Sequence, residues 1–356
     1  MTLLPIYLLL VAAAPSDPSD LLPLPPSSTP ADNVVSRLAA KIKSGEVKLA
    51  YDPDHGYLPA ILDALHVPVS SQVLVFTKTS FQASKISPRT PRALYHGDEV
   101  YVGWVRGGDV VELAAFDPKL GVAFYTLDQE QVRRPAIEQR GQECMQCHQH
   151  ASTLGVPGLV VRSVIPDRAG MPLFPGPSYI TDHRSPIDKR WGGWYVTGTH
   201  GEKVRHMGNA YVEKGEPASS FDTAPGANLK NLDRLFTTTS YLAPTSDIVS
   251  LMVLEHRIRV TNVVNRVNFE VRAKGKASPQ SIDAVVAAFR MDDEAPLQEP
   301  IEGVSSFRED YGVKLDLRTR LFAAKQSPLI DSPIFRSLPA DVQSQVHARL
   351  RRPATR

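Results

Sequence analysis

The amino-acid sequence predicts an α+β fold, in which an antiparallel β-rich part precedes a mostly helical C-terminal part. Four segments rich in β-branched and aromatic residues follow one another closely between residues 72 and 126. Turn signals containing Gly, Asp or Pro separate these segments, and no helical stretch lies between them, which favours an antiparallel meander over βαβ units. After residue 245 the apolar residues recur at helical spacing.

The chain opens with an apolar run, residues 3–14, that ends in three alanines. This run has the length of a signal-peptide core and is too short to span a bilayer, so residues 1–14 are predicted to be a signal peptide. No Lys or Arg precedes the run, and a buried N-terminal segment is the alternative. Residues 15–31 are rich in Pro and Ser, which predicts a disordered tether.

The β-rich domain is predicted over residues 32–213. It begins with two helices, over 32–43 and 58–65, the first capped by Asp32 or Asn33. The β-branched segments then predict strands at 72–76, 99–105, 110–115 and 122–126. Two further strands are predicted at 158–164 and 191–196.

The helical part is predicted over residues 228–352, after a linker at 214–227. Its periodicity predicts helices over 246–272, 279–291 and 340–351. The 40 Lys and Arg residues nearly balance the 38 Asp and Glu residues, and the net charge of +2 does not favour a nucleic-acid partner. No stretch approaches the length of a transmembrane span.

The two cysteines of the chain, Cys144 and Cys147, lie three positions apart, and His148 follows directly. This Cys-x-x-Cys-His spacing is the attachment signature of a c-type haem. Two thiols at this spacing can add across the two vinyl groups of one porphyrin, and the adjacent imidazole is then held under the iron as an axial ligand. The motif therefore predicts one covalently attached haem c, bound through Cys144 and Cys147, with His148 as a ligand of the iron. Such attachment takes place outside the cytoplasm, so the motif and the apolar N-terminus both indicate a periplasmic or otherwise exported protein.

Other chemistries of the motif remain as alternatives. A thioredoxin-like redox site needs a strand before it and a helix after it in a βαβ setting, which the flanking sequence does not predict. A zinc site could combine the two cysteines with His200 and His206, although the gap between the pairs is far longer than in structural zinc modules. A disulfide, or two buried thiols, leaves His148 unexplained.

Taken whole, the chain resembles exported bacterial proteins that contain a mono-haem cytochrome c domain. Besides the motif, residues 87–92, 191–195 and 205–209 carry this resemblance. It implies that the three motif residues attach the haem and ligate its iron, and it names no activity. Small soluble c-type cytochromes are all-helical, whereas residues 128–143 before the motif are polar and poorly periodic.

The sequence leaves the distal ligand of the iron open. Met207 lies 59 residues after His148, and its neighbour His206 could also reach the iron, as could His200. His256 lies among apolar residues of the predicted long helix, where an imidazole must find a hydrogen-bond partner or bind a metal. An ordinary core or hydrogen-bonded role is the alternative for each, and an open sixth position is the remaining possibility.

A haem also needs apolar walls and cations for its propionates. Candidates for the walls are Trp191, Trp194 and Tyr195, although aromatic residues beside glycines are equally typical of strand packing. Candidates for the cations are Arg89, Arg92 and Arg162.

Two classes of function follow from the predicted haem. An electron-transfer protein would hold the iron with two axial ligands and pass electrons to a redox partner protein. A haem enzyme would instead keep the sixth position open for a peroxide, a nitrogen oxide or a small organic substrate. The length of the chain favours the enzyme, and the lack of a recognisable distal catalytic pair favours the electron carrier. A redox or gas sensor is a third hypothesis.

Overall fold

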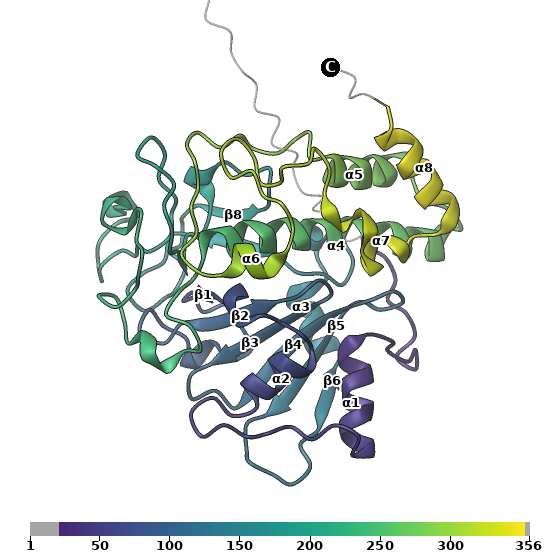
Figure 1. Ribbon diagram of the computed structural model, residues 1–356, viewed down its shortest axis with the longest axis horizontal. Coiled ribbons are helices and arrows are strands. Elements are labelled where there is room, and N and C mark those ends of the chain that lie inside the picture. Colours follow the sequence, from purple (N-terminus) through teal and green to yellow (C-terminus); the bar gives the residue numbers. More distant parts are fainter. Residues whose placement is uncertain (1–20, 353–356) are drawn as a thin grey trace, which may run out of the picture.

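The structure, a computed structural model, describes residues 21–352. Its N-terminal half forms a seven-stranded antiparallel sheet and its C-terminal half is mostly helical (Figure 1), which confirms the predicted α+β fold. The predicted signal peptide and the first six residues of the predicted tether lie outside the described residues. No helix in the described part is both long and apolar enough to cross a membrane.

The described end of the predicted tether packs onto the folded chain. Leu22 is buried against Val156 and Phe269, and its backbone N–H donates to the carbonyl of Gly155 at 3.0 Å. The side-chain amide of Gln149 donates to the carbonyl of Leu22 at 2.8 Å. Leu22 is therefore a packed residue, because its side chain finds an apolar site that the polar composition of the segment does not reveal.

Six consecutive strands form a meander, and a seventh strand joins its far edge. The sheet order is β6-β5-β4-β3-β2-β1-β9, and all neighbours are antiparallel. Its strands are β1 (Val73–Val75), β2 (Arg92–His96), β3 (Val100–Val105), β4 (Val110–Asp117), β5 (Gly121–Asp128), β6 (Ile137–Arg140) and β9 (Trp194–Tyr195). A second sheet pairs β7 (Val161–Val164) with β8 (Ser178–Thr181).

The predicted strands correspond to β1, β3, β4, β5, β7 and β9, whereas β2, β6 and β8 were not predicted. Strand β6 ends just before the cysteine motif, where the sequence suggested no strand. At the edge of the sheet it pairs with β5 in the antiparallel sense, so the βαβ setting of a thioredoxin-like site is not formed.

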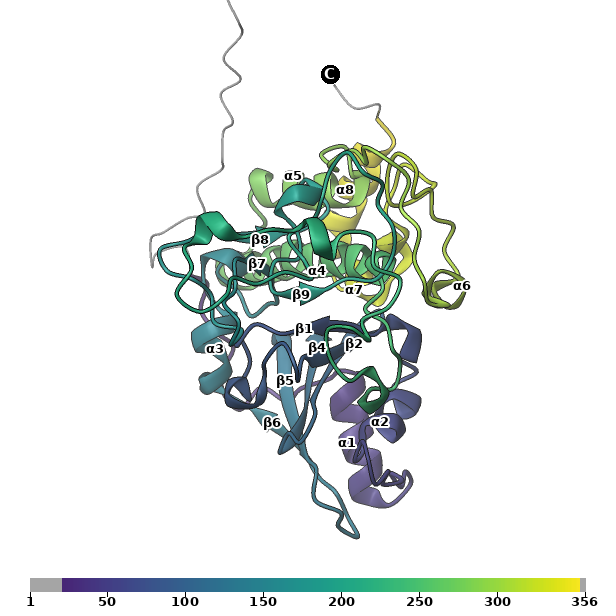
Figure 2. The ribbon, with the colours of Figure 1, turned by 90° about the vertical axis from the view of Figure 1, so that its left-hand side faces the viewer.

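The sheet separates two layers, because successive side chains of a strand point to opposite faces. Helices α1 (Val34–Ser44) and α2 (Leu58–Ala64) cover one face, where they pack on inward-facing apolar residues of the strands (Figure 2). Asn33 caps α1 and also donates from Nδ2 to the side chains of Asp117 and Tyr125, at 2.9 and 2.7 Å. These bonds fix α1 to strands β4 and β5.

Helix α4 (Ile248–Lys274) runs along the opposite face of the sheet (Figure 1) and is buried along almost its whole length. Asp247 caps its first turn, and Gly275 ends it in the left-handed conformation. Its N-terminal half packs on the sheet and on the second of four shorter helices, and its C-terminal half packs against the other three. In the described part of the chain these four helices are α5 (Pro279–Arg290), α6 (Phe307–Tyr311), α7 (Pro333–Arg336) and α8 (Ala340–Leu350).

The core that α4 shares with the sheet joins residues of the predicted β-rich domain to residues of the predicted helical part. The predicted helices correspond to α1, α2, α4, α5 and α8. Short 3-10 turns connect the elements at Val69–Ser71, Ala83–Lys85, Ala151–Thr153, Ile187–Lys189, Ala218–Ser220, Ala224–Gly226, Thr238–Ser240 and Pro328–Asp331.

Candidate haem-attachment site

The cysteine motif lies on the short helix α3 (Gln142–His148), which follows the edge strand β6. Cys144, Cys147 and His148 occupy positions i, i+3 and i+4, so they share one face of the helix. Both cysteines are free thiols. Cys144 is half-buried and packs against the core between the sheet and α4, whereas Cys147 is exposed. The helix therefore presents two thiols and an imidazole on one face.

His148 has the hydrogen-bond pattern of a metal-ligating histidine. Its Nδ1 lies 2.9 Å from the carbonyl oxygen of Gly158, so Nδ1 carries the proton and donates it to that oxygen. Nε2 makes no hydrogen bond in the described part of the chain. The ring packs on Phe124 of β5, with centroids 4.4 Å apart. Burial lowers the pKa of His148, which favours the neutral imidazole that a metal requires.

Charged side chains lie on the sheet face next to the motif. Arg92 of β2 forms an ion pair with Glu112 of β4 and lies over Gly103, where a side chain would occupy the place of its guanidinium. Arg140 of β6 donates to the hydroxyl of Thr126 at 2.8 Å. The Nε of Arg92 is buried and has no partner among the described residues. Of the three predicted propionate cations, Arg92 thus lies where its charge acts on His148.

The half-buried thiol of Cys144 is a weak acid in the folded chain. Burial raises its pKa to about 11, and the nearby carboxylates of Glu143 and Glu112 act in the same direction. The thiolate is the reactive form of cysteine, so folding makes Cys144 less reactive.

The segment with Met207 and His206 lies at the edge of the sheet remote from the motif. Asn209, two residues after Met207, donates its backbone N–H to the carbonyl of Trp194 in β9 at 2.9 Å. His148 packs on β5, five strands away from β9 in the sheet order, which is on the order of 20 Å at the usual strand spacing. The prediction that Met207 or His206 could face His148 across one iron therefore does not fit this structure.

These candidates also have partners of their own. The Met207 sulfur accepts a hydrogen bond from Ser163 at 3.5 Å, and Nδ1 of His206 accepts the N–H of Gly208 at 3.0 Å. His200 lies beside His206, with ring centroids 4.7 Å apart, and its two buried ring nitrogens have no hydrogen-bond partner among the described residues. The predicted wall residues Trp191, Trp194 and Tyr195 precede this segment and include β9, so they too lie at the far edge.

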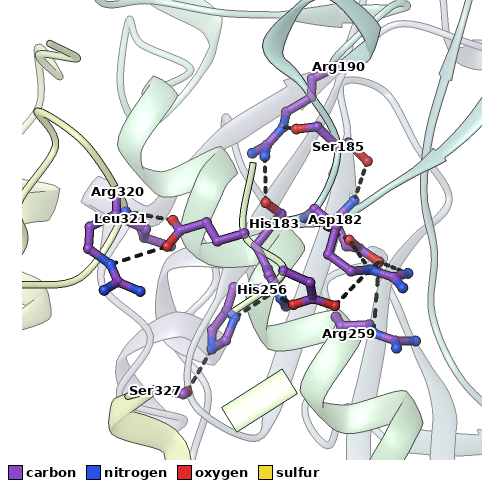
Figure 3. A network of polar contacts seen from close by, with 12 residues as sticks. Asp182, His183, Ser185, Arg190, His256, Arg259, Arg320, Leu321 and Ser327 are labelled. Atoms are coloured by element: carbon purple, nitrogen blue, oxygen red, sulfur yellow. Dashed lines mark hydrogen bonds and ion pairs between the residues drawn. The ribbon is translucent and has the colours of Figure 1, made fainter. Parts of the chain in front are cut away.

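His256 is fully engaged within the core (Figure 3). Its Nδ1 lies 3.1 Å from Nδ1 of His183, and its Nε2 lies 2.6 Å from the hydroxyl of Ser327. Nε2 of His183 lies 3.4 Å from a carboxylate oxygen of Asp293, which can only accept. His183 therefore accepts from Nδ1 of His256, and His256 in turn accepts from Ser327. His256 is a hydrogen-bonded core residue, the alternative role that the sequence left open for it.

The zinc alternative is not formed either. In the described part of the chain, no group of three or more His, Cys, Asp or Glu side chains is arranged to hold a metal ion. His200 and His206 are neighbours, but they do not combine with Cys144 and Cys147 into a four-ligand set.

Sequence reasoning missed the residues around His148 that come from distant parts of the chain. Phe124 and Gly158 contact the imidazole, and Asn262 of α4 holds the residue after Gly158. A signal for the last was present: polar residues recur at i, i+4, i+7 and i+11 along the predicted long helix, at Glu255, Arg259, Asn262 and Arg266.

Comparison with known proteins adds no relative, because no protein-family model, no curated protein and no solved structure matches the chain.

Proposed function

We propose that the chain is a periplasmic or otherwise exported mono-haem c-type protein, which binds one haem covalently and transfers electrons to a redox partner protein. The observation that carries this proposal is the hydrogen bond from Nδ1 of His148 to the carbonyl of Gly158. It leaves Nε2 without a partner on the helix face that also bears both thiols. Metal-ligating histidines typically donate their second nitrogen to a backbone carbonyl in this way.

The residues around the motif fit a bound haem. Such a haem supplies one-electron Fe(II)/Fe(III) chemistry. Cys144 and Cys147 would hold it through thioether bonds, and Phe124 gives an apolar wall beside His148. Arg92 and Arg140 lie on the same sheet face, each in an ion pair with a carboxylate, Glu112 and Glu138. The carboxylates of a porphyrin would share these two guanidinium groups. The exposure of Cys147 leaves one edge of the site open to solvent, which suits electron exchange with a partner protein.

The full chain, expressed with c-type maturation machinery, is expected to carry one covalent haem. The reason is that the motif is complete and its histidine is already oriented as a ligand. Haem staining of a denaturing gel, with haem quantified per chain, checks the result, and expression without the maturation machinery is the control. A chain that reaches the periplasm without covalent haem would contradict the proposal.

A second candidate function, a haem enzyme with an open sixth position, is favoured by one observation. Met207 and His206 lie at the β9 edge, His200 lies beside His206, and His256 is bonded to other residues. None of these four makes a hydrogen bond or ring contact with His148 in the part of the chain that the structure describes. None of the four candidate distal ligands is therefore placed beside His148.

If this second function holds, the reduced haem protein should bind carbon monoxide rapidly and to full occupancy, because no sixth ligand must be displaced. A flash-photolysis or stopped-flow measurement of the Soret band checks this. The variants Met207→Leu and His206→Phe should leave the spectrum unchanged. Absence of carbon monoxide binding, together with a spectrum altered by either substitution, would show instead a six-coordinate electron carrier.

A further inference from the structure

The carbonyl that orients His148 belongs to a loop that helix α4 holds in place. This carbonyl is that of Gly158. The side-chain amide of Asn262 makes two hydrogen bonds with the following residue, Leu159. Its Nδ2 donates to the carbonyl of Leu159 at 2.7 Å, and its Oδ1 accepts the N–H of Leu159 at 3.2 Å. This pair fixes the whole Leu159 backbone unit, including the peptide that joins it to Gly158. Asn262 is buried, so no solvent competes for these bonds.

Two neighbouring side chains on α4 extend the same contact. Asn265 donates to the carbonyl of Pro157 at 3.3 Å, and Arg266 donates to the carbonyl of Leu154 at 2.9 Å. Asn262, Asn265 and Arg266 follow the i, i+3, i+4 spacing of one helix face. The three side chains thus bind carbonyl groups of Leu154, Pro157 and Leu159, on both sides of Gly158. Of the three, only Asn262 also bonds to the Gly158–Leu159 peptide, whose carbonyl accepts from His148.

The contact is close, and it is tied directly to the motif. A side chain at residue 158 would collide with Oδ1 of Asn262, so glycine is needed for this approach. The N–H of Gly158 donates to the backbone carbonyl of His148 at 2.9 Å, while the Gly158 carbonyl accepts from the imidazole. His148 and Gly158 are therefore joined by two hydrogen bonds, and Asn262 holds the backbone of Leu159, the residue that follows Gly158.

We propose that Asn262 is a positioning residue for the haem ligand His148, acting through the Gly158–Leu159 peptide. This inference rests on the proposed function, because it assigns a role toward the bound haem. A carbonyl held rigidly at Nδ1 fixes the tautomer and ring orientation of the imidazole and makes its other nitrogen a stronger donor to the iron. When the amide of Asn262 is lost, the carbonyl is free to tilt away, and the iron–histidine bond weakens.

The test compares two buried asparagines of the same helix. In Asn262→Leu both hydrogen bonds to the backbone of Leu159 are lost. In the control, Asn268→Leu, an equally buried amide is lost whose Nδ2 donates instead to the hydroxyl of Ser337 at 2.9 Å. The measurements are the haem midpoint potential and, where the reduced iron is five-coordinate, the iron–histidine stretching frequency. Asn262→Leu should raise the potential and lower the frequency, whereas Asn268→Leu should change neither.

Asn262→Ala is the second variant if the bulk of leucine prevents folding, and it should shift both measurements in the same direction. Equal shifts in the Asn262 and Asn268 variants, or no shift in the Asn262 variants, would overturn the inference. A wild-type chain without covalent haem would overturn the proposed function itself, before any variant is compared. The two failures are therefore distinguishable.

Discussion

Replacement of both Cys144 and Cys147 by alanine is expected to abolish covalent haem on a denaturing gel. The thiols are the only sulfur nucleophiles of the chain, and each can form one thioether bond to a porphyrin vinyl group. Either single substitution should leave one thioether, so the stain persists and the absorption bands shift to longer wavelength. Covalent haem that remains unchanged in the double variant would refute the attachment roles.

The axial role of His148 has a matched control two residues later. His148→Ala should remove the iron ligand and change the Soret band of the native protein. His150→Ala should leave the band in place, because Nδ1 of His150 accepts the N–H of Ser152 at 3.1 Å and thereby caps a short 3-10 turn. A Soret change in the His150 variant alone would reassign the ligand.

Arg190→Met is expected to destabilise the protein by about 3–5 kcal/mol at pH 8, the usual cost of breaking a buried ion pair. Arg190, labelled in Figure 3, donates to the carboxylate of Glu255 at 2.9 Å, and both side chains are buried. The substitution leaves that carboxylate without a counter-ion. It also removes the bonds from Arg190 to the carbonyls of Ser185 and His183, at 2.7 and 3.1 Å. Urea unfolding monitored by tryptophan fluorescence measures the loss.

The cost of Arg190→Met should shrink as the pH falls. Burial raises the pKa of Glu255 to about 7 even though Arg190 acts in the opposite direction, and loss of Arg190 raises it further. A carboxyl group whose pKa is higher in the folded than in the unfolded chain destabilises the fold at high pH. Because the variant binds this proton at a higher pH than the wild type, the electrostatic part of the cost falls away as the pH decreases toward about 7. The matched double variant, Arg190→Met with Glu255→Met, should lose less stability at pH 8 than Arg190→Met alone. A pH-independent loss, or a double variant less stable than the single one, would contradict the role of the pair.

The apolar pattern predicted the central strands and the long helices, because those elements bury most of their side chains. It missed β6, whose residues Ile137, Glu138, Gln139 and Arg140 are mostly polar. An edge strand needs only one partner and little burial, so its composition resembles that of a loop. It also missed β2, where Arg92 occupies an inward position that its ion pair with Glu112 makes tolerable.

The residues of the candidate site also fall into those that the sequence identifies and those that it does not. The three motif residues were recognised from their Cys-x-x-Cys-His spacing, which can be read without knowledge of the fold. The distal candidates were chosen by residue type and by their distance from His148 in the sequence. Neither property reveals that the segment with Met207 lies beside β9, at the edge of the sheet remote from His148. The roles of Gly158 and Asn262 were not recognised, since they depend on the contact between Leu159 and Asn262, which lie 103 positions apart.

That contact sets an order of events for a chain that receives its haem after export. In such a chain, Asn262 would leave the translocation channel more than a hundred residues after the cysteines, so the loop that it holds would still be free when the motif first reaches the oxidising compartment. At that moment both thiols are open to solvent, and Cys144 has not yet acquired the raised pKa of the folded state. On the proposed function, we therefore expect haem attachment to precede docking of α4, which then fixes the orientation of a histidine that already holds its haem.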